Sequence, residues 1–141
     1  MGSKKYSGRN LRAEHGTSLV EFAIASVVLF MTIFGLVEFG LAIWQNNVVA
    51  SLAKDAARYA ATHGSTTTSP ATSADVETYV RERSFELRPT VTTSWPDGGS
   101  PPNSPGKRVE VVVQHNFSAL TRFVPFTTIT LRSTAQLVIS R

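Results

Sequence analysis

The stretch that decides the fold is Gly16–Trp44, GTSLVEFAIASVVLFMTIFGLVEFGLAIW. It carries no charged residue from Phe22 to Val37, while Glu21 and Glu38 flank that uncharged run. The 28 residues after its first glycine would form roughly 42 Å of α-helix at about 1.5 Å per residue. Because that length is sufficient to cross the hydrocarbon core of a bilayer, the sequence predicts a transmembrane helix over about residues 19–44.

The residues before this stretch form a polar, basic leader. They contain Lys4, Lys5, Arg9 and Arg12 against Glu14, a charge of +3, so the rest of the chain carries only 4 − 3 = +1 of the formal net charge. Positively charged flanks stay in the cytoplasm, which predicts a cytoplasmic N-terminus and an extracytoplasmic chain after Trp44. The apolar segment exceeds that of a secretory signal, and no Ala-x-Ala-like box follows it, so a retained helix is favoured. No nucleic-acid partner is expected, since the positive charge belongs mostly to the leader.

Glu21 allows two interpretations, because a carboxylate inside a membrane segment is costly unless it has a partner or a function. In the first, it lies at the membrane interface and its side chain reaches water. In the second, cleavage after Gly16 creates an α-amino group on Thr17, one helical turn away. Groups at positions i and i+4 share a helix face, so the ammonium and carboxylate could neutralise each other within one subunit or between neighbours. Cleavage would also remove the +3 charge that holds this end at the cytoplasmic surface.

Several motifs indicate a known family. The basic leader, GTSLVEF at residues 16–22 and the long apolar helix resemble the cleavage and assembly region of type IV pilins. More narrowly, Glu21-Phe22-Ala23, Glu38-Phe39-Gly40 and the later AARYAA at residues 56–61 resemble the TadE-like family. Its members are minor pilins or pseudopilins of the tight-adherence (Tad/Flp) pilus system. The resemblance covers about residues 16–63.

The resemblance implies a processing site, a location and a set of partners. Prepilin peptidase would cleave between Gly16 and Thr17, and Glu21, Phe22 and Glu38 would serve assembly and charge pairing. The protein would reside in the bacterial cytoplasmic membrane, and at the pilus or cell surface after processing. Its partners would be other pilin or pseudopilin subunits and the pilus assembly machinery, and its role would be in surface adherence. Whether the new terminus is N-methylated is left open, because Thr17 stands where many type IV pilins have phenylalanine.

Glu38 also has two interpretations. It follows Glu21 by 17 residues, about 25 Å along a helix, so one carboxylate would lie near each membrane face. It is either an interfacial residue at the outer boundary, which we favour, or a contact for a basic group of another subunit. Trp44 is a good interfacial anchor at the same end.

After Trp44 the helix is predicted to continue to residue 63. Apolar residues recur there at spacings of three and four, namely Val49, Leu52, Ala53, Ala56, Ala57 and Ala60. This alanine stripe could pack on the protein's own sheet, on helices of other subunits, or on both. Gly64 is predicted to cap the helix, and His63 to interact with the helix C-terminus, not with a ligand.

The remaining chain predicts a small α+β domain, giving a pilin-like α+β fold. A leader at 1–16 and a long helix at 17–63 would be followed by a flexible polar linker at 64–73 and an extracytoplasmic domain at 74–141. Within that domain we expect a helix over residues 74–87 that is capped by Thr72 or Ser73 and ended by Pro89. Its buried side is predicted as Val76, Tyr79 and Val80, with Phe85 and Leu87. Strands are predicted at 90–95, 107–117 and 127–140, forming an antiparallel sheet with a helix on one face. The segment 96–106 is predicted as a loop, and 117–126 as an aromatic connection tucked under the sheet.

Catalysis is not expected. The chain has no cysteine, and its three histidines, His15, His63 and His115, lie in separate regions without metal-ligand spacing. No nucleophile elbow, P-loop or dinucleotide fingerprint is present. We therefore expect no catalytic residue, no cofactor and no metal.

Two functions remain from different classes. The first is a structural role, as a processed, membrane-inserted TadE-like minor pilin or pseudopilin. The second is an unprocessed, single-span protein of the cell envelope whose outer domain binds a partner. The GTSLVEF motif behind a basic leader favours the first, whereas the proline-rich loop leaves room for the second.

Overall fold

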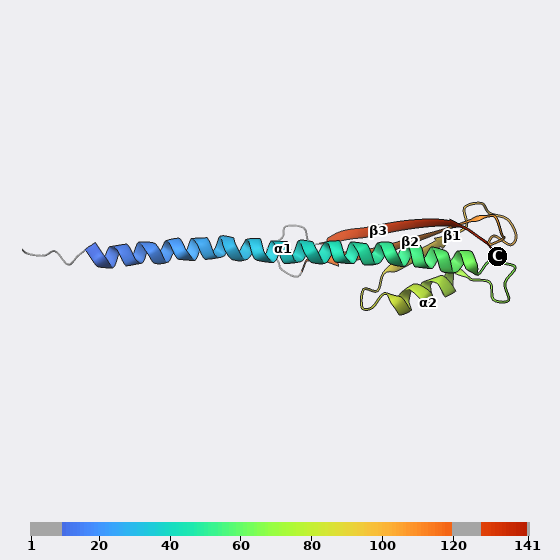
Figure 1. The fold of residues 1–141 in the computed structure, drawn as a ribbon, viewed down its shortest axis with the longest axis horizontal. Coiled ribbons are helices and arrows are strands. Elements are labelled where there is room, and N and C mark those ends of the chain that lie inside the picture. The colour runs from blue at the N-terminus through green and yellow to red at the C-terminus, as the bar shows by residue number, and fades with distance from the viewer. Residues whose placement is uncertain (1–9, 120–127, 141) are drawn as a thin grey trace, which may run out of the picture. The chain divides into compact units, whose positions relative to one another are not determined.

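The computed structural model of the chain describes residues 10–119 and 128–140. Helix α1 spans Asn10–Thr62 and α2 spans Ser73–Arg83, and three strands follow, β1 at Thr90–Ser94, β2 at Arg108–Ser118 and β3 at Thr128–Val138 (Figure 1). The chain divides into a first unit, Met1–Glu38, and a second unit, Phe39–Arg141, with α1 continuing from one into the other. The predicted α+β class, with a long helix, a short helix and a small antiparallel sheet, is confirmed.

Helix α1 begins within the predicted leader. At its end, side chains contact the last backbone carbonyl groups. It starts at Asn10, seven residues before the predicted start at Thr17. At its other end the Thr62 hydroxyl donates to the Arg58 carbonyl at 3.0 Å, and His63 Nδ1 lies 2.9 Å from the Tyr59 carbonyl oxygen. The prediction that His63 serves the helix terminus is confirmed. A left-handed glycine cap at residue 64 is wrong, because the positive-φ glycines of the described chain are all found later, at 98, 99 and 106.

Helix α2 has the predicted cap but is shorter than predicted. The Asp75 amide donates to Thr72 Oγ1 at 3.3 Å, and the Thr72 amide donates to Asp75 Oδ2 at 2.9 Å, which completes a capping box. The Thr72 hydroxyl also donates to Asp75 Oδ2 at 2.7 Å, and this bond, followed by the bond from the Thr72 amide, holds the pKa of the Asp75 carboxyl below its ordinary value. The helix ends at Arg83 and not at residue 87, because Phe85 has φ +52° and cannot continue a right-handed helix.

The sheet is antiparallel with the order β1-β2-β3. Strand β2 alternates as predicted, with the side chains of Val109, Val111 and Val113 fully buried on one face. Val112 on the opposite face is also buried, between Thr92 of β1 and Thr134 of β3. The predicted strands are confirmed to within two residues at each described end. The predicted aromatic connection at 117–126 lies mostly outside the described residues.

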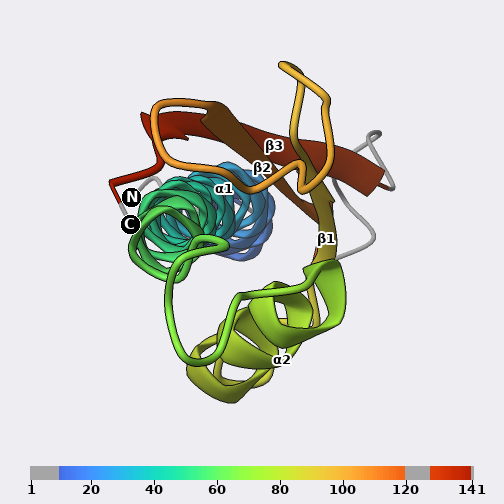
Figure 2. The same ribbon diagram turned by 90° about the vertical axis from the view of Figure 1, so that its right-hand side faces the viewer.

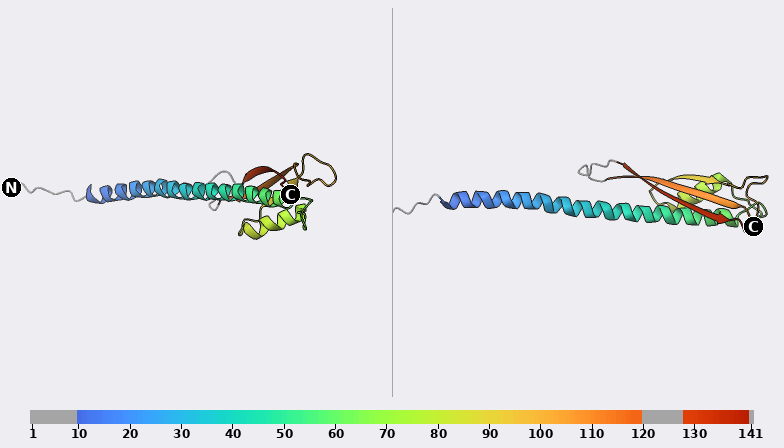
Figure 3. Two further views of the ribbon diagram at one scale, coloured as in Figure 1. Left: turned by 45° about the vertical axis from the view of Figure 1, so that its right-hand side comes forward. Right: turned by 90° about the horizontal axis from the view of Figure 1, so that it is seen from above.

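The core of the second unit joins the C-terminal part of α1 to α2 and the sheet. Figure 2, which looks along α1, shows the sheet on one side of this part and α2 on another. The right panel of Figure 3 shows β2 and β3 running alongside it. All six residues of the predicted alanine stripe are buried in one cluster with Val76 and Val80 of α2 and with the β2 valines. The stripe therefore packs on the protein's own domain.

Two connecting segments of the second unit are held in place by hydrogen bonds and an ion pair. The segment 64–73 is packed and hydrogen-bonded, since Ala71 is buried and its amide donates to the His63 carbonyl at 2.7 Å. The segment 96–106 is a loop, as predicted, and it is tied back to β2 by an ion pair of 2.7 Å between Asp97 and Arg108. Hydrogen bonds from Arg108 hold the pKa of the Asp97 carboxyl below its ordinary value.

Candidate membrane and assembly helix

The first unit presents an apolar helix whose side chains are not covered. Every described side chain from Gly16 to Val37 is exposed except Ser26, which is half-buried, and Phe22 reaches 73% exposure. The best 18-residue window of α1 has a mean hydropathy of 2.3, and none of it is buried. One long apolar helix of this kind fits a single-pass membrane protein.

The magnitude of this exposure argues against an aqueous environment. Thirteen large apolar side chains between Leu19 and Val37 are exposed. At about 1.5–3 kcal/mol for each such side chain, leaving them in water forgoes roughly 20–40 kcal/mol. That exceeds the whole stability of an ordinary domain, about 5–15 kcal/mol. An apolar environment such as a bilayer therefore suits this part of α1 far better than water does.

The polar side chains of the apolar segment are compatible with lipid. Ser26 donates its hydroxyl proton to the Phe22 carbonyl at 2.7 Å, and Thr32 donates to the Val28 carbonyl at 2.8 Å. Both hydroxyls are thus hydrogen-bonded within the helix itself. They need no water at membrane depth, because the expensive state in hydrocarbon is an unsatisfied polar group.

The predicted processing residues lie inside α1. Gly16 and Thr17 both have helical backbone, and an added Cβ at Gly16 would meet no atom within 4 Å. Thr17 and Glu21 are one turn apart on a continuous helix, so they share a face. Glu21 and Phe22 are both exposed. The structure thus supplies the predicted i, i+4 geometry, while the cleavage and the charge pair themselves stay predictions.

Glu38 is in a different environment from Glu21. It is the first buried residue of α1 from Gly16 onward, at 7% exposure. A carboxylate at this degree of burial needs polar contacts to offset its lost hydration. The Glu38 side chain would have to become exposed before it could contact a basic group of another subunit. Its role in assembly stays a prediction.

The described residues offer little other chemistry. Among the residues that the structure describes, no three His, Cys, Asp or Glu side chains are grouped so that they could hold a metal ion. His63 serves the end of α1, whereas His115 lines a cleft with Trp44, Phe85 and Leu87. The prediction that Phe85 is buried is wrong, since its side chain is 84% exposed. Helical periodicity could not reveal this, because the left-handed backbone at this residue has no signal in the sequence.

Comparison with known proteins finds a match to the same part of the chain, helix α1. Residues 16–58 match the family model described as TadE-like protein, which covers 43 of the 141 residues. No curated protein and no solved structure matches the chain significantly. The match includes the glycine before the predicted cleavage point, both glutamates and the first part of the alanine stripe. The predicted resemblance is therefore confirmed over this segment: residues 16–58 are similar to the TadE-like family.

Proposed function

We propose that this protein is a TadE-like minor pilin or pseudopilin that is inserted in the cytoplasmic membrane, processed by prepilin peptidase after Gly16, and used in Tad-type (Flp) pilus assembly and surface adherence. The observation that carries the proposal is the uncovered apolar part of α1 within the family match. In this proposal the basic leader holds the N-terminus in the cytoplasm, and the second unit lies outside.

The proposed cleavage converts an anchored helix into one that can change its surroundings. Hydrolysis of the Gly16–Thr17 peptide bond leaves a carboxylate on the leader and an ammonium on Thr17. The cationic leader is lost, and with it the attraction to the cytoplasmic surface. The apolar helix can then leave the lipid only for an equally apolar environment, because exposure to water would cost roughly 20–40 kcal/mol. A bundle of similar helices in a filament provides that environment.

The structure adds a requirement for this cleavage. Since α1 begins at Asn10, the scissile bond lies within a helix, and a peptidase must unwind about one turn to reach it. Glycine lowers the cost of unwinding, because it destabilises a helix interior by about 1 kcal/mol relative to alanine. After cleavage, Glu21 would lie in the second turn of a shortened helix. Its carboxylate would share a helix face with the new ammonium of Thr17, four residues earlier, and interact favourably with it.

Mass spectrometry of the protein from the membrane fraction tests the processing step. We expect a mature N-terminus at Thr17, and we expect Gly16→Leu to retain the leader. Gly35→Leu is the matched control: it lies on the same helix with equally open space around it, and it should be processed normally. An intact N-terminus in cells with an active prepilin peptidase would refute the proposal and favour the unprocessed, anchored binding protein.

The role of Glu21 is tested separately. Glu21→Ala should leave membrane insertion and processing intact but reduce assembly, measured as the number of pili and the amount of sheared surface protein. Glu21→Gln keeps the size of the side chain and removes its charge, so it should be equally defective if pairing with the Thr17 ammonium matters. Normal piliation in both variants would contradict the charge-pairing role.

A further inference from the structure

Phe85 is an exposed aromatic residue in an unusual backbone conformation, and packing in the core explains neither feature. It is 84% exposed, more than any other large apolar side chain among the described residues. Its φ of +52° lies in the left-handed region, where a bulky residue is a genuine outlier. Arg88, three residues on, has φ +44°. The segment between α2 and β1 is thus strained at two positions, yet it presents an aromatic ring to its surroundings instead of burying it.

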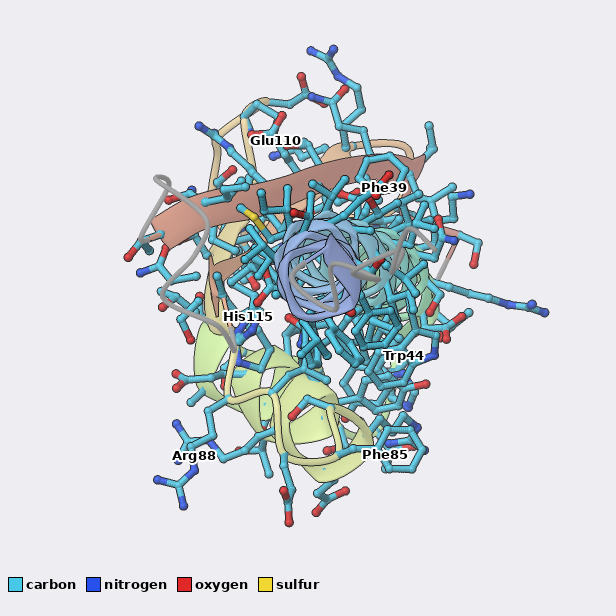
Figure 4. The ribbon with its side chains drawn as sticks, turned by 90° about the vertical axis from the view of Figure 1, so that its left-hand side faces the viewer. Phe39, Trp44, Phe85, Arg88, Glu110 and His115 are labelled. Atoms are coloured by element: carbon cyan, nitrogen blue, oxygen red, sulfur yellow. The ribbon has the colours of Figure 1, made fainter. Side chains whose placement is uncertain are left out.

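Phe85 shares a surface with Trp44. Both residues line an open cleft of about 640 Å³, together with Gln45, Glu86, Leu87 and His115. Figure 4 shows the Trp44 and Phe85 side chains on the same side of the second unit, with Arg88 farther round. Trp44 is itself 52% exposed. We call Trp44 and Phe85 the aromatic surface.

The position of this surface points to its partner. Trp44 closes the apolar stretch of α1, where the membrane-spanning part of the helix would leave the bilayer. Tryptophan and other aromatic side chains concentrate at that level, because the headgroup region accepts both apolar rings and polar groups. Phe85 reaches the same cleft from a segment 41 residues later in the chain.

We infer that the aromatic surface docks onto the lipid interface of the membrane that α1 spans, with Phe85 inserted among the upper acyl chains. This inference rests on the proposed function only for the insertion of α1. Docking gives the second unit a second attachment beside the helix and keeps it against the outer face of the membrane until assembly. The strained backbone at Phe85 is explained, because it turns the ring outward toward lipid.

The charges around the aromatic surface indicate whether headgroup charge or apolar contact would attract it to the membrane. Glu86 lines the cleft, and Arg81 and Arg88 line a second cleft that also includes Phe85. Because Arg81 is paired with Glu77 at 2.6 Å, the formal charges beside Phe85 sum to about zero. Attraction to anionic headgroups is therefore weak, and the apolar contact dominates. Docking should occur on vesicles of pure phosphatidylcholine and should change little when phosphatidylglycerol is added.

The absence of cysteine from the chain makes a direct depth measurement simple. The full-length protein would be reconstituted in phosphatidylcholine vesicles with one fluorophore on an introduced cysteine. Glu86→Cys reports on the aromatic surface, and Leu29→Cys reports on the span. Val138→Cys is the matched control for exposure, at 59%. It lies near Ser140, whose amide donates to the Ala61 carbonyl, and Ala61 is about 25 Å along α1 from Trp44.

We expect nitroxide on the upper acyl chain to quench the probe at residue 86. Nitroxide deep in the bilayer should quench the probe at residue 29. Neither nitroxide should quench the probe at residue 138. Adding Phe85→Ser to Glu86→Cys should reduce quenching at residue 86 to the level of residue 138. This double variant can fold, because Phe85 makes no contribution to the core.

Four results would overturn the inference. If the probe at residue 29 is quenched but the probe at residue 86 is open to aqueous iodide, docking fails while insertion stands. If the probe at residue 29 is not quenched, insertion and docking fail together. Quenching that survives Phe85→Ser removes Phe85 as the anchor. Protection from iodide that increases with the protein-to-lipid ratio, without quenching by lipid, would mean that a second copy of the chain covers the surface.

Discussion

Replacing Ala57 by leucine tests whether the alanine stripe of α1 is the protein's own core or an assembly surface. Ala57 is fully buried in the cluster formed by α1, α2 and β2. The substitution adds three carbon atoms where there is no exposed surface. Overpacking of this kind usually costs about 1–3 kcal/mol, because neighbouring side chains must leave their preferred rotamers.

This cost should be visible as a lower melting temperature. For a unit of about 100 residues, 1 kcal/mol shifts the midpoint by about 4–8 °C, so Ala57→Leu should lower it by between about 4 and about 24 °C. Lys54→Leu is the matched control, with the same new side chain at an exposed position of the same helix. Its effect should stay within about 0.5 kcal/mol.

The assay is thermal unfolding of the full-length chain in detergent micelles, followed by the fluorescence of Trp95. Trp95 is packed against the core cluster, and Trp44→Phe in all variants removes the second tryptophan. Equal midpoints for Ala57→Leu and Lys54→Leu would refute the packing described above. A loss of pili without a loss of stability would then assign the stripe to contacts between subunits.

Two further predictions concern the second unit. Tyr79→Ala should destabilise it by at least about 0.5–1.5 kcal/mol in chemical denaturation. The reason is that the Tyr79 ring stacks on the Tyr59 ring, with centroids 4.4 Å apart, and the Arg83 guanidinium lies over it, 3.8 Å from the centroid. Tyr79→Phe keeps the ring and should retain most of the stability. Acidification should destabilise the unit through Asp97, whose pKa in the folded state is lowered by Arg108. The unfolded chain takes up this proton first, so the contribution is complete above the ordinary carboxyl pKa of about 3.9 and is lost as the pH falls through the lower folded value. Asp97→Asn should flatten this part of the stability–pH curve, and an unchanged slope would contradict the assignment.

Local information accounts for the features that were predicted correctly. The membrane-length helix follows from an uninterrupted apolar composition, and strand β2 follows from the alternation of valines with polar residues. The Thr72 cap follows from a threonine three residues before an aspartate. In each case the residues that produce the signal are neighbours in the chain, and the physical effect acts over one or two turns or over adjacent strand positions.

The errors arose where the backbone left its usual conformations or where distant segments met. The periodicity of residues 74–87 predicts a helix with Phe85 on its buried side, but φ is positive at Phe85, the helix ends before it, and the residue is exposed. A glycine cap at residue 64 was the obvious choice from composition. Side chains of Thr62 and His63 perform that role instead, which depends on rotamers that the sequence does not specify.

The sequence by itself determined that this protein has an apolar helix too hydrophobic for water, with a glycine and a glutamate near the N-terminal end of the apolar stretch. The family match lies on that segment. Only the tertiary structure decided which surfaces are occupied. It buried the alanine stripe in the protein's own domain, buried Glu38 while leaving Glu21 exposed, and brought Phe85 to the cleft of Trp44. The reason is physical: hydropathy is a property of each residue, whereas burial depends on which distant residues the folded chain places around it.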